Sequence, residues 1–199
     1  MKILALSGSY RPDGPTEQAT RALLAGAASR GAETRFVALR DKDIHFCTNC
    51  RVCTQKPGDA PGECSQKDDM KGLIHECLSS DVLILSAPIN FYETTALTRK
   101  FLERLLPFGY WPWDKKFFGF RPRGKARKAV IFSSSAAPGL MIPLLMPHST
   151  DTLKVMAKTL GAKVVKQWCF GLVGSKPRVE LSERKLKKAF ALGAKLASA

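Results

Sequence analysis

The sequence predicts an α/β fold: one domain, residues 1–199, built on a doubly wound parallel sheet of five strands. Two observations carry this prediction. The predicted strands are apolar, and they alternate along the chain with helical patterns of ordinary length. Such alternation is typical of a parallel sheet covered by helices on both faces. The chain has 199 residues, 45% of them hydrophobic, which suits one domain with a sizeable core.

The predicted strands are short apolar runs that end in small or polar residues. The run Ile3 to Leu6 leads into the loop SGSYRPDGPTEQ, and the run Val82 to Pro88 is followed by the loop residues INFYET. A third run enters a loop of small residues, Ser133 to Gly139. The five predicted strands cover residues 3–6, 33–39, 82–88, 128–132 and 162–170.

Helical periodicity fills the segments between these strands. In the first helix Pro15 suits the first helical position, with Gly14 before it. Asp68 and Asp69 stand at the start of the second helix, where negative charge is favourable. The predicted helices cover residues 15–27, 68–80, 93–106, 151–161 and 183–196.

Three loops follow strands of this sheet and should lie at one edge, where ligands bind in doubly wound folds. The first combines a helix N-terminus with the hydroxyls of Ser9 and Thr16 and with Arg11, which suits a phosphate; an ordinary capped turn is the alternative. The sequence contains neither GxGxxG nor a P-loop motif. The second loop could present Phe91 and Tyr92 to a flat heterocycle, or bury them as packing residues.

Four cysteines lie close together in the segment from residue 44 to 65. Cys47, Cys50 and Cys53 are separated by two residues each, and Cys64 follows after ten more. This spacing favours a [4Fe–4S] cluster. Zinc and free or redox-active thiols remain as alternatives, since structural zinc more often uses two separated CxxC pairs. Cys77 and Cys169 fall in a helix and a strand and are interpreted as core residues.

Targeting signals and net charge indicate the cellular compartment of the protein and the kind of partner that it binds. The N-terminal apolar run is too short for a signal peptide, and no run is long enough for a membrane helix, so we expect a cytoplasmic protein with no membrane contact. The net charge of +15 favours an anionic partner, such as a phosphorylated cofactor, an acidic protein, nucleic acid or anionic lipid. A basic solvated surface would explain the charge equally well.

An insertion from residue 107 to 128 mixes aromatic with basic residues. Its sequence, PFGYWPWDKKFFGFRPRGKARK, falls between a predicted helix and a predicted strand. We expect it to form a contact between subunits that covers the ligand. Binding of NADPH phosphates or of an acidic partner, single-stranded nucleic acid and a plain solvated loop are the alternatives.

Several of these segments together resemble the NAD(P)H-dependent FMN reductase family. The resemblance rests on Gly8-Ser9-x-Arg11-x-x-Gly14-x-Thr16, on Ser86-Ala87-Pro88-x-x-Phe91 and on the helix end Lys100 to Arg104. The cysteine segment up to Met70 is similar to the iron–sulfur flavoprotein branch. The resemblance implies a flavodoxin-like fold with strand order 2-1-3-4-5 and bound FMN. It places the phosphate on Ser9, Arg11, Thr16, Glu17 and Gln18, and the flavin ring against Pro88, Ile89, Asn90, Phe91, Tyr92, Ser133, Ser134, Ser135 and Ala136.

The function that this resemblance implies is an FMN-dependent NAD(P)H oxidoreductase and electron-transfer iron–sulfur flavoprotein. Electrons would pass from NAD(P)H through FMN to a flavin, a quinone or a one-electron acceptor such as an acidic redox protein. A homodimer or homotetramer is expected, and no acid–base catalytic residue is required. A cluster-free FMN or quinone reductase, or a flavin- or nucleic-acid-binding module without turnover, is the alternative. Pro15 stands where the family often has Asn, which removes one phosphate contact.

Overall fold

Five parallel strands form the centre of the computed structural model, which describes residues 1–122, 124–173 and 178–198. The sheet order is β2-β1-β3-β7-β8, which is 2-1-3-4-5 when the parallel strands alone are counted. The predicted fold class and strand order are therefore confirmed. The strands are β1 (Lys2–Ser7), β2 (Glu33–Ala38), β3 (Val82–Asn90), β7 (Arg127–Ser134) and β8 (Ala162–Phe170).

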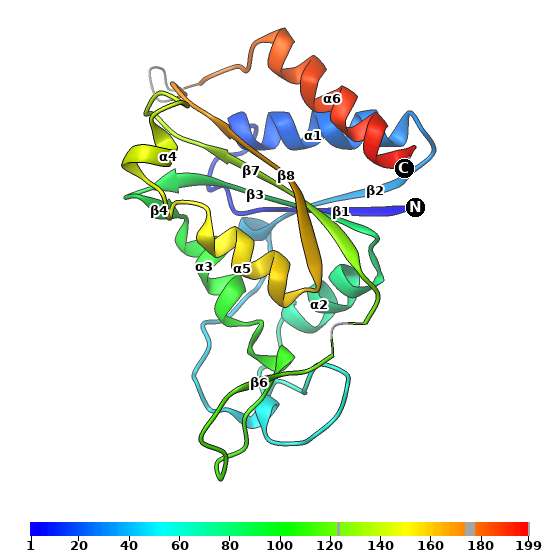
Figure 1. The fold of residues 1–199 in the computed structure, drawn as a ribbon, viewed down its shortest axis with the longest axis vertical. Coiled ribbons are helices and arrows are strands. Elements are labelled where there is room, and N and C mark those ends of the chain that lie inside the picture. Colours follow the sequence, from blue (N-terminus) through cyan, green and yellow to red (C-terminus); the bar gives the residue numbers. More distant parts are fainter. Residues whose placement is uncertain (123, 174–177, 199) are drawn as a thin grey trace.

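Helices cover both faces of this sheet. In Figure 1, α1 (Pro15–Ala28) and α6 (Glu183–Ala197) lie above it, and α2 (Met70–Ser79), α3 (Ala96–Glu103) and α5 (Asp151–Thr159) lie below. Side chains alternate between the two faces, because Ile3 belongs to the core beneath α1 and Leu4 to the core against α2 and α3. Within the described residues, none of the helices has the length and apolar character needed to cross a membrane.

The helix predicted to begin at residue 93 begins instead at Ala96. Residues Glu93–Thr94 form a short strand, β4, that pairs antiparallel with the end of β3. The two residues between the strands, Phe91 and Tyr92, both have left-handed backbones, with φ of 46° and 66°. Aromatic residues strongly disfavour this conformation, so the sequence carries no signal for the turn.

A second structural unit lies below α2 and α3 in Figure 1. We call residues 44–66 and 107–122 the cysteine lobe. It contains the two-stranded pair β5 (Gly109–Tyr110) and β6 (Gly119–Phe120) and a 3₁₀ turn, Val52–Thr54. Ile44 and Phe108 belong to the buried cluster beneath the sheet, so the lobe continues the main core. Short helical turns at Leu39–Asp41, Leu106–Phe108 and Ile142–Leu145 (α4) complete the described elements.

Two arginines join the two halves of the cysteine lobe. The Arg51 guanidinium lies between the rings of Trp111 and Trp113, at 3.7 and 4.0 Å from their centroids. Arg121 is 5% exposed and donates hydrogen bonds to backbone carbonyls of both halves. These acceptors are Pro107, Gly109, Gly58, Cys53 and Lys56. The aromatic and basic insertion therefore packs against the cysteine segment.

Candidate functional site

A cavity of about 440 Å³ opens at the carboxyl edge of the sheet, where the loops after β1, β3 and β7 meet. Such edges are the binding sites of doubly wound folds, and the volume falls in the range of small-molecule pockets. Predicted residues from all three loops line this cavity: Ser9, Arg11, Thr16, Pro88, Ile89, Asn90, Ser134, Ser135 and Ala136.

The first loop leaves the N-terminus of α1 facing this cavity. Gly14 is the N-cap residue and has no side chain to cap the helix, while Pro15, at the first helical position, has no N–H. The Ser9 hydroxyl accepts from the Arg11 N–H at 3.2 Å and donates to the Arg11 carbonyl at 2.9 Å, which shapes the loop. The uncapped helix end and the nearby guanidinium suit an anion such as a phosphate.

Glu17 and Gln18, which the resemblance placed on the phosphate, are bound to other protein groups. The Glu17 carboxylate is fully buried, pairs with Arg40, and accepts hydrogen bonds from the Ser7 hydroxyl at 3.1 Å and the Asp13 N–H at 3.2 Å. The hydrogen bond with Glu17 raises the pKa of Arg40 above its usual value.

The Gln18 amide donates to the carbonyls of Asp13 and Val179 and accepts from the Leu181 N–H. Neither Glu17 nor Gln18 is among the residues that line the cavity. The side chains of both residues therefore hold the shape of the loop, and their backbone N–H groups belong to the first turn of α1.

Three further predicted residues also lie outside the cavity lining. The side chains of Phe91 and Tyr92 project into solvent and are 100% and 66% exposed. Ser133 is fully buried in β7, and its hydroxyl has no hydrogen-bond partner among the described residues. The second loop therefore reaches the cavity through Pro88, Ile89 and Asn90, and its aromatic residues form an apolar rim outside it.

Three of the four predicted cysteine ligands lie near the fourth, the buried thiol of Cys53. Burial, and next the negative charges of Cys64, Cys47 and Cys50, raise the pKa of Cys53 to about 11. Cys50 is exposed, and hydrogen bonds from the Ser65 hydroxyl and then the Val52 N–H lower its pKa. The backbone is left-handed at Asn49 and Arg51, a geometry that turns N–H groups toward an anionic ligand such as a thiolate.

No three Cys, His, Asp or Glu side chains converge as ligands of one ion in the described parts of the chain. An iron–sulfur cluster is larger than one ion, so its cysteine sulfurs stand farther apart. Four thiols are the donor set of a [4Fe–4S] site, and the assignment of Cys47, Cys50, Cys53 and Cys64 to such a cluster stays a prediction.

A buried ion pair anchors Cys64 to the main core. Arg104 and Asp68 pair with side chains that are only 2% and 1% exposed. Arg104 also donates to the His45 carbonyl at 2.9 Å and lies 3.5 Å from the Cys64 sulfur. Burial alone raises the pKa of Asp68, but hydrogen bonds from Arg104 and from the N–H groups of His45 and Met70 outweigh it and lower the pKa.

Helix α3 reaches both candidate sites. At its start, the Thr95 hydroxyl donates to the Gly8 carbonyl of the first loop at 2.6 Å. At its end, Arg104 contacts Cys64. The sequence motif from Lys100 to Arg104 marked this helix end, but not the role of Arg104 as a buried anchor.

Comparisons with known proteins show the family that this chain is similar to. Residues 1–140 match the family model described as NADPH-dependent FMN reductase. An iron–sulfur flavoprotein of Methanocaldococcus jannaschii is 30% identical over 149 residues, which are 75% of this chain and 70% of the relative. An iron–sulfur flavoprotein of Archaeoglobus fulgidus is 34% identical over 119 residues, and this stretch is about half (52%) of that relative's length.

Solved structures agree on the fold. The NAD(P)H:quinone oxidoreductase of Methanothermobacter marburgensis superposes with a TM-score of 0.72 at 16% identity, covering 98% of both chains.

Proposed function

Because the chain belongs to the NADPH-dependent FMN reductase family, and to its iron–sulfur flavoprotein branch, we propose that it is an FMN-dependent NAD(P)H oxidoreductase that also holds a [4Fe–4S] cluster. Its electrons would pass from reduced nicotinamide to a quinone, a flavin or a one-electron acceptor. The observation that carries this proposal is the cavity in which the loops after β1, β3 and β7 meet beside an uncapped helix N-terminus.

The residues of the cavity suit FMN part by part. The free N–H groups of the first turn of α1 and the Arg11 guanidinium would hold the phosphate. Pro88, Ile89 and Asn90 on one side and Ser134 to Ala136 on the other would hold the ring between two loops. Bound FMN supplies hydride acceptance and release of single electrons; the protein orients it and limits its contact with water.

Replacing Arg11 by alanine tests the phosphate assignment. We expect FMN binding to weaken by about 1.5–3 kcal/mol, the size of a hydrogen bond to a charged group. The measurement is an FMN titration of the apoprotein, followed by flavin fluorescence. Arg30→Ala is the matched control, because Arg30 follows the opposite end of α1 and is exposed. Equal FMN affinity in wild type and Arg11→Ala would remove Arg11 from the site.

The cysteine segment supports the cluster by its donors and its backbone. Cys47, Cys50, Cys53 and Cys64 provide four thiol groups, and the left-handed residues Asn49 and Arg51 flank Cys50, whose sulfur accepts a hydrogen bond from the Val52 N–H. A bound cluster carries one electron at a time, so a flavin and a cluster in one protein convert a two-electron donor into single-electron steps.

Replacing Cys50 by serine tests this assignment. We expect anaerobically purified protein to lose its iron, its sulfide and the broad visible absorbance, because a hydroxyl replaces one thiolate ligand, while FMN stays bound. The control is Cys169→Ser, which changes a half-buried cysteine in β8. Full iron content in Cys50→Ser would contradict its role as a ligand.

An apolar rim around the cavity favours a second copy of this chain as its cover. Phe91 and Tyr92 are joined there by Leu140, Leu144 and Leu172, which are 97%, 79% and 67% exposed. Figure 1 places β4 and α4 at this same edge of the molecule. The strained turn at residues 91–92 disfavours a purely structural role, because left-handed aromatic residues cost of order 1–3 kcal/mol each. Homodimers that bury this rim would shield the flavin from water.

An anaerobic absorption spectrum combined with NAD(P)H oxidation tests the function as a whole. We expect a flavin spectrum, a broad cluster absorbance, and consumption of NAD(P)H when an acceptor is present. A flavin spectrum and NAD(P)H oxidation without iron or sulfide would favour the cluster-free reductase. Protein that stays colourless after incubation with FMN would contradict the proposed function.

A further inference from the structure

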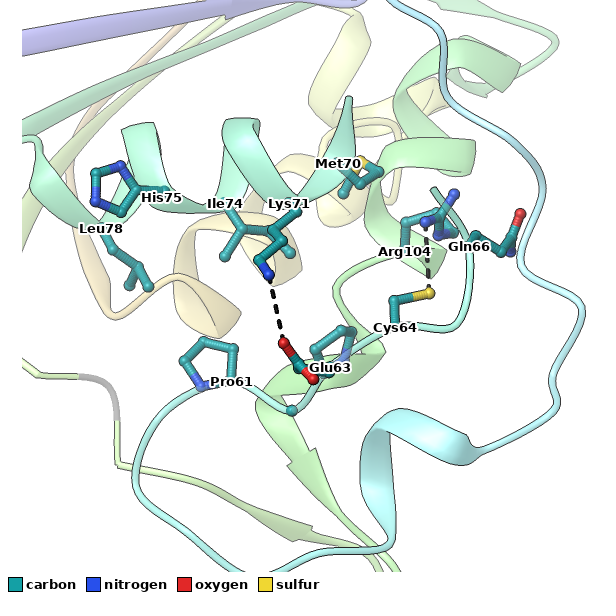
Figure 2. A pocket seen from close by; sticks show the side chains of 12 residues that line it. Pro61, Glu63, Cys64, Gln66, Met70, Lys71, Ile74, His75, Leu78 and Arg104 are labelled. Carbon is teal, nitrogen blue, oxygen red and sulfur yellow. Dashed lines mark hydrogen bonds and ion pairs between the residues drawn. The ribbon is translucent and has the colours of Figure 1, made fainter. Parts of the chain in front are cut away.

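A second cavity, of about 210 Å³, lies between α2 and the stretch from Pro61 to Gln66 (Figure 2). It shares no lining residue with the cavity at the carboxyl edge of the sheet. Cys64 stands on its wall, and Arg104 donates toward that sulfur at 3.5 Å. A molecule in this cavity would therefore lie against Cys64, a predicted ligand of the proposed cluster.

The walls of this cavity are mainly apolar, with polar groups around them. Ile74 and Leu78 point from α2 toward Pro61 (Figure 2), and Met70 and Pro107 also line the cavity. Lys71 and His75 are the exposed polar residues that α2 contributes. Lys71 pairs with Glu63 at 3.3 Å, but both side chains are nearly nine-tenths exposed. Such a pair is weak, so the ammonium group is free to exchange Glu63 for an oxygen of a ligand.

The size of the cavity limits what can bind. Pockets for drug-sized ligands and cofactors measure about 300–1,000 Å³, so a flavin or a nicotinamide dinucleotide is too large here. One or two fused rings match the volume. The apolar walls favour a flat hydrocarbon frame, and the ammonium of Lys71 favours carbonyl oxygens that gain negative charge on reduction.

We propose that this cavity binds a small quinone as the electron acceptor of the cluster; the electron route, but not the binding, rests on the proposed function. NAD(P)H supplies a hydride, which is two electrons and one proton, and solvent supplies the second proton. With both cofactors bound, the two electrons and two protons would reduce the quinone to the quinol, which would leave the cavity, while the nicotinamide would be oxidised to NAD(P)⁺.

A bulky substitution that fills this cavity shows whether the quinone binds here or in the flavin cavity. The probe is duroquinone, because its ring carbons are all methylated and do not add thiols. In Ile74→Trp we expect the KM for duroquinone to rise about tenfold, since the indole occupies the space of the ring and a loss of about 1.4 kcal/mol is a factor of ten. Gly72→Trp is the matched control: Gly72 is on the same helix, is exposed, and has open space around its Cα.

Lys71→Gln provides a second variant that leaves the packing unchanged, because Lys71 is exposed. We expect its KM to rise about threefold, because the Lys71 ammonium is exposed and solvent weakens its interaction with the ligand. Iron, sulfide and FMN content and NAD(P)H:FMN turnover, measured for each variant, report intact folding. A wild-type KM for duroquinone in folded Ile74→Trp and Lys71→Gln would overturn the proposal.

Equilibrium dialysis of duroquinone against the oxidised holoprotein tests binding without turnover. Saturable binding in wild type and Gly72→Trp that is lost in Ile74→Trp supports the site, and equal binding in all three overturns it. Wild-type protein that binds duroquinone at this cavity but contains no iron would refute the cluster and its electron route, and would leave the binding site standing. The two failures are therefore distinguishable.

Discussion

Replacing Arg104 by alanine is expected to lower the free energy of unfolding by about 3–5 kcal/mol, the cost of breaking a buried ion pair. The variant leaves the Asp68 carboxylate buried without its charged partner, and it also removes the hydrogen bonds to His45 and toward Cys64. Urea unfolding at pH 7, followed by circular dichroism, measures the loss. Arg99→Ala is the control, since its pair with Glu103 is exposed and contributes little.

The same variant has a pH dependence with a definite sign. In the wild type the pKa of Asp68 is lowered, so its contribution is present above the unfolded value of about 4 and is lost as the pH falls through the folded pKa. Without Arg104, burial raises the pKa of Asp68. At pH 7 the unpaired carboxylate is charged and destabilises the variant, and this destabilisation becomes smaller as the pH falls and the carboxylate takes up a proton. The difference in stability between the two proteins should therefore narrow from pH 7 to pH 5.

A double variant, Asp68→Asn with Arg104→Leu, separates charge from packing. It removes both buried charges, so we expect it to be more stable than Arg104→Ala alone. A double variant as unstable as Arg104→Ala, together with a pH-independent difference, would show that lost packing and not the unpaired carboxylate causes the effect.

Replacing Arg121 by alanine is expected to open the cysteine lobe, with a local loss of about 3–5 kcal/mol. The estimate follows from several buried carbonyls losing a charged donor, each hydrogen bond being worth about 1.5–3 kcal/mol before water replaces part of it. Hydrogen exchange should accelerate in residues 44–66 and 107–122 and stay slow in β1 and β3. The iron content of the variant should also fall when the lobe opens, because Arg121 donates a hydrogen bond to the Cys53 carbonyl.

Arg121→Lys tests whether geometry or charge matters in this lobe. A lysine keeps the charge but cannot reach carbonyls on several sides at once, so it should restore only a minor part of the protection. Unchanged hydrogen exchange in Arg121→Ala would mean that the stacking of Arg51 on Trp111 and Trp113 is sufficient to hold the lobe.

The sheet and most of its helices could be predicted because their signals are local. The predicted strands at residues 82–88 and 162–170 correspond to β3 and β8, and Pro15 begins α1 as predicted. The helix expected from residue 93 was wrong over its first three residues, because pairing of Glu93–Thr94 with β3 depends on a turn at Phe91 and Tyr92 that their residue types disfavour.

The candidate sites were harder to predict, because the burial and pairing of several side chains depend on residues that are distant in the sequence. The small and polar residues of the first and third loops predicted a binding site, and residues of both loops line one cavity in the structure. Nothing in the sequence distinguishes the buried Arg104 and Arg121 from solvated arginines, because both lie in segments rich in exposed basic residues. Glu17 likewise has the pattern of a first-turn acid, and only the fold brings Arg40 against it.

In the proposed function, helix α3, with Thr95 on the Gly8 carbonyl and Arg104 beside Cys64, would make the binding of FMN and of the cluster thermodynamically interdependent. A ligand that orders the first loop also favours one position of this short helix, and hence one position of the thiol at its far end. Reciprocity then requires that loading of iron and sulfide tighten the affinity for FMN by the same factor by which FMN assists that loading.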